Sequence, residues 1–462
     1  MPVKYIDVTA TSELFAPAVR AFGDIAIVGK GRFGVPLTAP QDFTSPTAAV
    51  NALNGGGQTT LSADAAGAAT TVAVPVSVPV GTVVQLGTGP TAEVRTVTAV
   101  AATSAPVATP AGGPAPPGGP APGGPAPAAP PPPTTFTLTL DTPLATAHPA
   151  ATPVTQVGDC DLVQAIRTAF RQSPPPTRIW GVLVDPTNLD WETALTAVDT
   201  LDVQIVVLAN TPLNQANVPT LGRLAAHVSA DLGDGKERIG VAMLDPSLSV
   251  DNAVALNAAP VKNERMVLIA HKSPDDVAAA TAGVIAGYQP HISMLLKPID
   301  IAMPQLFADT DIDKLDSHLI NWVTSPVLLP GQALYLGEGY TSDASHDKKY
   351  IDIVRALDDI NFRIKAVLIE AIGNLRISRV GLRSIVTLVQ SVLFPLVSQQ
   401  VIEDFTVVIP LLTLFDKDPA TLSAAETTEI ATARATRSVD MTVEVVYAGA
   451  IHRLKIDLVL TG

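Results

Sequence analysis

The sequence has almost no cysteine: Cys160 is the single cysteine in 462 residues. This excludes an internal disulfide framework and indicates a reducing compartment or an assembly without covalent cross-links. Positive charge is also scarce, because 29 lysine and arginine residues stand against 43 acidic ones and the net charge is −14. Nucleic-acid binders need a basic surface, so the composition argues against a nucleic-acid partner.

A long uninterrupted apolar run is also missing. The most apolar segment, 380–397, contains Arg383, Gln390 and Pro395, whereas a membrane-spanning helix needs about 20 mostly apolar residues. We predict a buried helix there and expect no membrane partner. Because 47% of the residues are hydrophobic, the chain can still bury a large core, enough for roughly two to four domains.

Motifs for catalysis, cofactors and metals are absent as well. The seven histidines are scattered, with no H-x-x-x-H pair and no neighbouring cysteine to complete a zinc site. Neither a G-x-S-x-G motif nor a P-loop is present. Cys160 lies between Asp159 and Asp161, which would raise its thiol pKa and make it a poor nucleophile. We therefore predict no catalytic residue, no cofactor and no metal, while a catalytic site dispersed along the sequence stays open.

One motif that is present could suggest a dinucleotide-binding enzyme. The segment 24–36, DIAIVGKGRFGVP, contains G-x-G-x-x-G after a short apolar run. That fingerprint needs a helix that opens on its last glycine, but Pro36 and Pro40 fall where the first turns would be. We predict a strand that leaves through a glycine turn into an extended segment.

The chain between residues 158 and 300 predicts an α/β fold with a mostly parallel, helix-covered sheet as its core. Continuously apolar strands are expected where helices cover both sheet faces. The predicted strands are 178–186, 203–210, 238–246 and 265–272, and the predicted helices are 191–199, 221–232 and 275–286.

Residues 55–157 differ in composition and are predicted to be a small β-module inserted at the surface. Short strands are expected at 83–86, 93–100 and 135–140. The segment 106–133 has 13 prolines and six glycines in 28 residues, which predicts a disordered loop. A proline-rich ligand for an SH3-type domain is the alternative.

Two predicted strands end in an Asp-Pro pair, Asp185-Pro186 and Asp245-Pro246. Carboxylates at these strand ends could form a catalytic pair. We favour helix capping, because Asp at the N-cap followed by Pro is a common helix start.

The C-terminal half is predicted to be mostly helical. Helices are expected at 348–372 and 382–400, followed by a strand at 405–412. Ser423 and Glu426 form a capping box for a further helix, and the chain is expected to end in a hairpin, 438–462.

Four segments in order along the chain resemble the contractile tail sheath proteins of phages and phage-like injection systems. They are the strand and glycine turn of 24–43, the AGVIAG and KP elements of 282–299, the helix 350–368 and the closing strand 447–460. The segments 315–323 and 286–291 depart from the family pattern, which indicates a divergent branch. The resemblance divides the chain into an N-terminal arm with the first core strand (1–54), the insertion (55–157), an α/β domain (158–300) and a C-terminal domain (301–462).

The resemblance implies a structural subunit that polymerises around an inner tube in stacked rings and contracts to drive the tube through a target envelope. Its implied partners are other copies of itself, the inner tube protein, and baseplate and terminator proteins, with no enzymatic activity. The protein would assemble in the bacterial cytoplasm and reside in a phage tail or phage-like particle. Two alternatives stay open: another phage or cell-surface structural protein, and a cytosolic α/β enzyme.

The two chain ends have the alternation of strands with one apolar face. The resemblance implies that they link neighbouring subunits by completing each other's sheets; closure of the subunit's own sheet is the alternative. In the N-terminal arm, Lys4 shares a face with Ile6 and Val8. The candidate linking residues are Val3, Tyr5, Ile6, Val8, Leu454, Ile456, Leu458 and Leu460.

Charges at the start of the predicted helix 348–372 could contact the inner tube. The candidates are Lys348, Lys349 and Arg355. A solvated helix face is the simpler interpretation of the same charges.

Overall fold

The structure is a computed structural model, and it describes residues 23–104, 134–230, 235–256, 258–329, 331, 333–343 and 348–452. The predicted loop 106–133 and all eight candidate linking residues lie outside the described residues. The chain divides into two compact units, one formed by residues 28–166 and 181–194 and the other by the rest of the chain.

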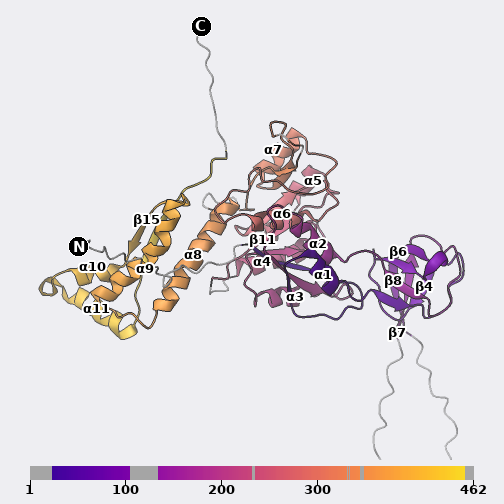
Figure 1. The fold of residues 1–462 in the computed structure, drawn as a ribbon, viewed down its shortest axis with the longest axis horizontal. Helices are drawn as coiled ribbons and strands as arrows, with labels where there is room; N and C mark the ends of the chain where they lie inside the picture. The colour runs from indigo at the N-terminus through magenta and orange to yellow at the C-terminus, as the bar shows by residue number, and fades with distance from the viewer. Residues whose placement is uncertain are drawn as a thin grey trace, which may run out of the picture. The chain divides into compact units, whose positions relative to one another are not determined.

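The largest sheet has eight strands in the order β14-β13-β12-β11-β10-β1-β9-β2. Its strand β11 is labelled in Figure 1. The pairs β10–β11, β11–β12 and β12–β13 are parallel, and β13–β14 is antiparallel. The prediction of a mostly parallel α/β sheet is confirmed. The strands are β1 (Asp24–Lys30), β2 (Gln41–Phe43), β9 (Arg178–Val184), β10 (Ile205–Leu208), β11 (Ile239–Met243), β12 (Met266–Ala270), β13 (Asn321–Thr324) and β14 (Tyr335–Leu336).

Helices cover this sheet, and every residue of β10, β11 and β12 is buried, as expected for strands covered on both faces. Helices α4 and α6 both pack on β10 and β11. The helices along this part of the chain are α1 (Pro46–Leu53), α2 (Asp161–Phe170), α3 (Trp191–Val198), α4 (Val218–Ser229), α5 (Val250–Ala255), α6 (Val277–Gly287) and α7 (Asp309–Ser317).

Helix α6 is the most deeply buried helix of this region, with residues 277–286 all buried. It can pass close to the 169–174 segment because two of its positions are glycine. A Cβ atom added at Gly283 would lie 2.4 Å from the carbonyl oxygen of Ala169, and one at Gly287 would lie 2.1 Å from that of Pro174. The AGVIAG element of the sequence is therefore a packing requirement of this helix.

The glycine-rich turn of the sequence follows β1 directly. Gly34 has φ of 67°, a conformation that glycine adopts at low cost. The chain then runs extended to β2, and the next helix, α1, starts only at Pro46. A helix does not open on this turn, so the dinucleotide-binding fingerprint is not completed.

A second, antiparallel sheet of six strands lies within residues 58–156, in the order β3-β8-β5-β6-β7-β4 (Figure 1). It has its own hydrophobic cluster, built from residues such as Val74, Leu86 and Leu138, which are fully buried. Its strands are β3 (Gln58–Thr60), β4 (Thr71–Val74), β5 (Val83–Leu86), β6 (Glu93–Ser104), β7 (Thr134–Leu140) and β8 (Pro153–Gln156).

The C-terminal region consists of two long helices, α8 (Ile351–Ala371) and α9 (Arg379–Ser398), with a two-stranded sheet and two shorter helices. The predicted capping box of Ser423 and Glu426 is confirmed at the start of the last helix. The remaining elements are β15 (Ile402–Val408), α10 (Pro410–Asp416), α11 (Ala424–Thr436) and β16 (Thr442–Tyr447).

Helix α9 contains the apolar segment 380–397. Among the described residues it is the one helix long and apolar enough to cross a membrane by length and composition. Its Val389 and Leu393 are fully buried and pack with β15, while Val380 and Phe394 are exposed. The prediction of a buried helix therefore holds for one face only.

Three sequence predictions are wrong in detail. The predicted strand 405–412 ends at Val408, because Pro410 starts helix α10, where its missing N–H costs nothing. Asp185 and Asp245 do not cap helices: each accepts a backbone hydrogen bond from the residue two positions later, and α3 and α5 start further on. The α/β sheet also continues beyond the predicted boundary at residue 300, because β13 pairs with β12.

Candidate assembly site: an open sheet and the root of the C-terminal strand

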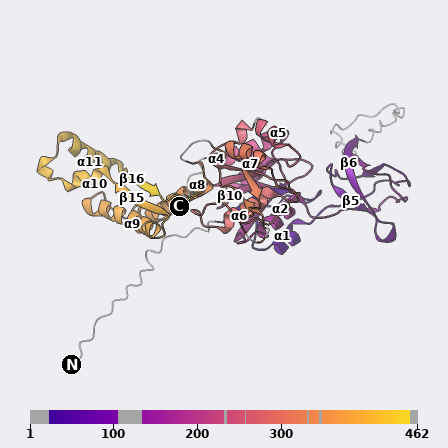
Figure 2. The same ribbon diagram turned by 90° about the horizontal axis from the view of Figure 1, so that it is seen from above.

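The two-stranded sheet of β15 and β16, which we call the open sheet, is the most unusual feature of the C-terminal region (Figures 1 and 2). Within the described part of the chain, each of its strands pairs only with the other, and a strand edge without a partner strand can pair with another chain. A sheet of two strands is marginally stable without further packing.

The register of the open sheet sorts its residues onto two faces. Phe405 pairs with Val445 and Val407 with Val443, and these four side chains pack against the cluster around Val389 of α9. All four remain only half-buried. The inner face of the open sheet is thus apolar but incompletely covered.

The segment 448–452, which we call the C-terminal root, follows β16 and is held by side chains from several elements. Nδ1 of His452 lies 2.9 Å from a carboxylate oxygen of Glu338, and Nε2 lies 2.9 Å from the hydroxyl of Ser293. The His452 ring also packs on the ring of Tyr350, with 4.5 Å between the centroids. These contacts fix the point from which the chain continues to residues 453–462.

The end of β16 is tied to helix α8 by a partly buried hydrogen bond. The hydroxyl of Tyr447 donates to Oδ2 of Asp352 at 2.8 Å. Burial raises the pKa of the Asp352 carboxyl, and burial also raises the pKa of the Tyr447 phenol. A buried carboxylate is costly unless it is paired, so the Asp352 carboxylate needs hydrogen-bond donors or a cation to offset its burial.

The three candidate tube-facing residues lie just before α8 or in its first turns. Lys348 and Lys349 precede α8: Nζ of Lys348 lies 2.7 Å from Glu264, and Nζ of Lys349 lies 4.7 Å from the ring centroid of Tyr340. Arg355 is buried, donates to the carbonyl oxygen of Tyr288, and burial lowers its pKa to about 10. A tube-facing role stays a prediction, and the burial of Arg355 argues against it for that residue.

Sequence reasoning missed Asp352, Tyr447, His452 and Glu338. The apolar residues Ile351, Val354 and Leu357 form a stripe at helical spacing on α8, yet Leu357 is half exposed while Asp352 is buried. An acidic residue next to that stripe was a usable signal, but its partners are about 90 residues or more away in sequence, and pattern alone does not link them.

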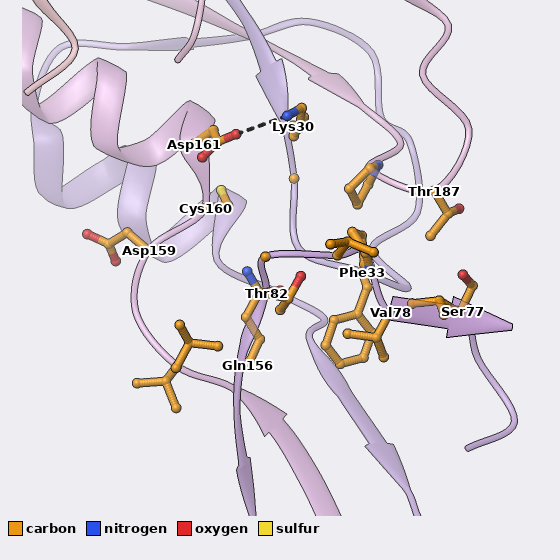
Figure 3. Close-up of a pocket in the computed structure, with 18 of the residues that line it drawn as sticks. Lys30, Phe33, Ser77, Val78, Thr82, Gln156, Asp159, Cys160, Asp161 and Thr187 are labelled. Carbon is orange, nitrogen blue, oxygen red and sulfur yellow. Dashed lines mark ion pairs between the residues drawn. The ribbon is translucent and has the colours of Figure 1, made fainter. Parts of the chain in front are cut away.

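The structure offers a second candidate site, a cavity of about 530 Å³ in the other unit (Figure 3). Lys30 and Asp161 in its wall form an ion pair at 3.6 Å. Cys160 also lines it, and burial raises the pKa of its thiol, which confirms the predicted direction. A poorly ionised thiol makes a weak nucleophile, so this arrangement does not support covalent catalysis. In the described part of the chain, no group of three or more potential metal ligands is found.

The start and end of the inserted module are held next to this cavity by one side chain. The guanidinium of Arg32 donates to the carbonyl oxygens of Asn54 and Gly158. The Asn54 amide in turn donates to Asp159 at 2.7 Å. Arg32 therefore fastens both ends of the 55–157 segment together.

The fold is that of the sheath proteins of contractile machines. The sheath of the extracellular contractile injection system PVC, in its contracted state, matches with a TM-score of 0.50 and 13% identity, over 65% of this chain and 80% of that one.

Two further solved structures show weaker similarity. The contracted helical sheath of the anti-feeding prophage has a TM-score of 0.48 and 14% identity, over 64% of this chain and 81% of that one. The sheath tail protein Lin1278 of Listeria innocua has a TM-score of 0.45 and 13% identity, over 94% and 96%. No protein-family model matches the chain, and the search of curated proteins gave no match.

Proposed function

We propose that the protein is a structural, non-enzymatic subunit of a contractile sheath. It would polymerise around an inner tube in stacked rings, bind a baseplate and a terminator protein at the ends, and contract to drive the tube through a target envelope. Assembly in the bacterial cytoplasm and residence in a phage tail or phage-like particle belong to the same proposal.

The open sheet is the observation that carries this proposal. Its two unpaired edges and half-covered apolar face suit the addition of strands from other copies, and backbone pairing of this kind is a common mode of recognition. The two chain ends supply candidate strands, each with the alternation of a half-buried strand. Backbone hydrogen bonds formed in this way can persist while the subunit bodies reorient, which keeps the polymer continuous between two packings.

The C-terminal root fits this arrangement. His452, fixed by Glu338 and Ser293, is the last described residue before the predicted linking strand 454–460. An anchored root orients the strand that follows and lowers the entropy lost when it pairs with a neighbour.

Electron microscopy of the purified protein, with and without its tube protein, tests the proposal. We expect hollow, helically striated tubes from the full chain. Variants lacking residues 1–9 or 454–462 should stay soluble and folded but form no long tubes. Normal tubes from either truncation would refute strand exchange at that end, and an unfolded truncation would show that the strand belongs to the subunit's own core.

A further inference from the structure

A cavity of about 330 Å³ lies at the end of β16, beside the open sheet. It is lined by the C-terminal root, by the start of α8 and by the last residue of β16. The residues at its wall are Tyr350, Asp352, Ile353, Tyr447, Gly449, Ala450 and His452.

Asp352 gives this cavity its chemical character. The residue is only 3% exposed, and Tyr447 occupies its Oδ2. Among the residues that the structure describes, Oδ1 has no hydrogen-bond partner. A buried carboxylate oxygen without a hydrogen-bond partner is unfavourable, and a cationic hydrogen-bond donor offsets its desolvation best.

The other charged and titratable groups near Asp352 do not fill this need. His452 and Arg355 both contribute a favourable charge to Asp352, but neither donates a hydrogen bond to its Oδ1, and Arg355 donates to the carbonyl oxygen of Tyr288. His452 lies between Glu338 and Ser293, and Lys349 lies over the outer rings of Tyr340 and Tyr350. The cavity therefore joins a carboxylate oxygen to the rings of Tyr350 and Tyr447, a combination that suits an ammonium group.

The N-terminal arm carries such a group in a matching pattern. Lys4 shares one strand face with Ile6 and Val8, so burial of those two apolar side chains would carry Lys4 inward with them. On β16, the half-buried inward positions are Val443, Val445 and Tyr447. Antiparallel addition to the β16 edge can align Val8 with Val443, Ile6 with Val445 and Lys4 with Tyr447.

We propose that Lys4 of a neighbouring copy enters this cavity and pairs with Asp352, setting the register of the exchanged N-terminal strand. The inference rests on the proposed strand exchange and adds its direction, its register and its polar anchor. An inward-facing charge pair of this kind penalises slipped registers, because a slip by two residues would bury Lys4 against Val445 and leave Asp352 unpaired.

A double-mutant cycle tests the pairing, with the protein concentration needed for half-maximal tube formation as the readout. Lys4→Met and Asp352→Asn should each raise this concentration by roughly tenfold or more, as expected when one partner of a buried charge pair is removed. The double variant should be no worse than the poorer single variant. Asp7→Asn, on the opposite face of the same arm, is the matched control and should stay within about twofold of the native chain.

Cysteine cross-linking tests the register and does not depend on Asp352→Asn folding. The native Cys160 is buried, so introduced cysteines dominate the oxidation. Val8→Cys with Val443→Cys should give a ladder of cross-linked copies on a non-reducing gel, whereas Lys4→Cys with Val443→Cys, which reports a parallel strand, should not.

The outcomes separate the pairing from the proposed function. Suppose the truncation of residues 1–9 blocks tubes but Lys4→Met has no effect, or the effects of Lys4→Met and Asp352→Asn on the half-maximal concentration simply multiply in the double variant. The pairing is then wrong and strand exchange stands. A cross-link within one chain would assign the arm to its own subunit and overturn the pairing between copies. Tubes from the truncated chain would overturn exchange of the N-terminal strand itself.

Discussion

Replacing Gly283 of helix α6 by alanine tests whether the close approach of this helix holds the α/β sheet together. A Cβ atom at this position would lie 2.4 Å from the carbonyl oxygen of Ala169, whereas an ordinary contact begins at 3.4 Å. Relief of the clash needs a shift of about 1 Å between two packed segments, because backbone rather than a flexible side chain is in the way. Residues 277–286 are buried throughout, so the shift disturbs contacts on every side of α6.

The expected loss in free energy of unfolding is about 2 kcal/mol. Overpacking of this kind costs roughly 1–3 kcal/mol and occasionally more, and the better helix propensity of alanine returns up to about 1 kcal/mol. Urea unfolding followed by tryptophan fluorescence measures the loss, because Trp180 and Trp322 lie on β9 and β13 of the sheet.

Gly222 on helix α4 provides the matched control. A Cβ atom there would lie 3.3 Å from the Pro260 side chain and 3.8 Å from the Pro260 carbonyl oxygen, far less crowded than at Gly283, so Gly222→Ala should be neutral or stabilising by up to about 1 kcal/mol. If Gly283→Ala unfolds at the same urea concentration as Gly222→Ala, the close approach of α6 carries no energetic weight and the explanation of the AGVIAG element fails.

Three further predictions concern pH, charge and the insertion. Burial raises the pKa of the Asp352 carboxyl above its unfolded value of about 3.9. Ionisation of Asp352 therefore costs the folded subunit nothing below about pH 3.9, and the cost grows as pH rises through the folded pKa. Asp352→Asn should accordingly gain stability relative to the native subunit as pH rises above about 3.9 in urea titrations, and a pH-independent difference would contradict this. Glutamate at both Lys348 and Lys349 should reduce co-sedimentation with tube protein. The subunit should stay folded, because an exposed ion pair such as Lys348–Glu264 contributes only about 0–1 kcal/mol. Unchanged co-sedimentation would remove these lysines from the tube interface. Deletion of residues 106–133 should leave tube formation intact in electron micrographs, and failure to form tubes would make that segment part of the lattice.

The strands and helices of the α/β region could be predicted from sequence because their signals are local. The apolar runs at 203–210, 238–246 and 265–272 each contain a strand of the sheet. Local signals also mislead: the apolar run through 405–412 continues past Pro410, yet the strand ends at Val408 because proline starts a helix more readily than it extends a paired strand.

The candidate assembly site was much less accessible from the sequence. Tyr447 and Asp352 are 95 positions apart, and nothing in the alternation of β16 indicates which carboxylate its tyrosine meets. Strands β15 and β16 are likewise separated along the chain by two helices, α10 and α11. The sequence therefore predicted a hairpin at residues 438–462 and not the pairing of β15 with β16. Long-range polar contacts of this kind depend on the tertiary arrangement and leave no periodic trace.

The hydrogen bonds of Arg32 have a consequence for the domains that can be inserted between Asn54 and Gly158. Because one guanidinium binds the carbonyl oxygens of Asn54 and Gly158, the inserted segment leaves and rejoins the chain at a single fixed point. The six-stranded module has its own hydrophobic cluster, and its place could be taken by any domain whose two ends lie close together. If the subunit forms the proposed tube, foreign domains grafted between Asn54 and Gly158 would be displayed at regular intervals along it.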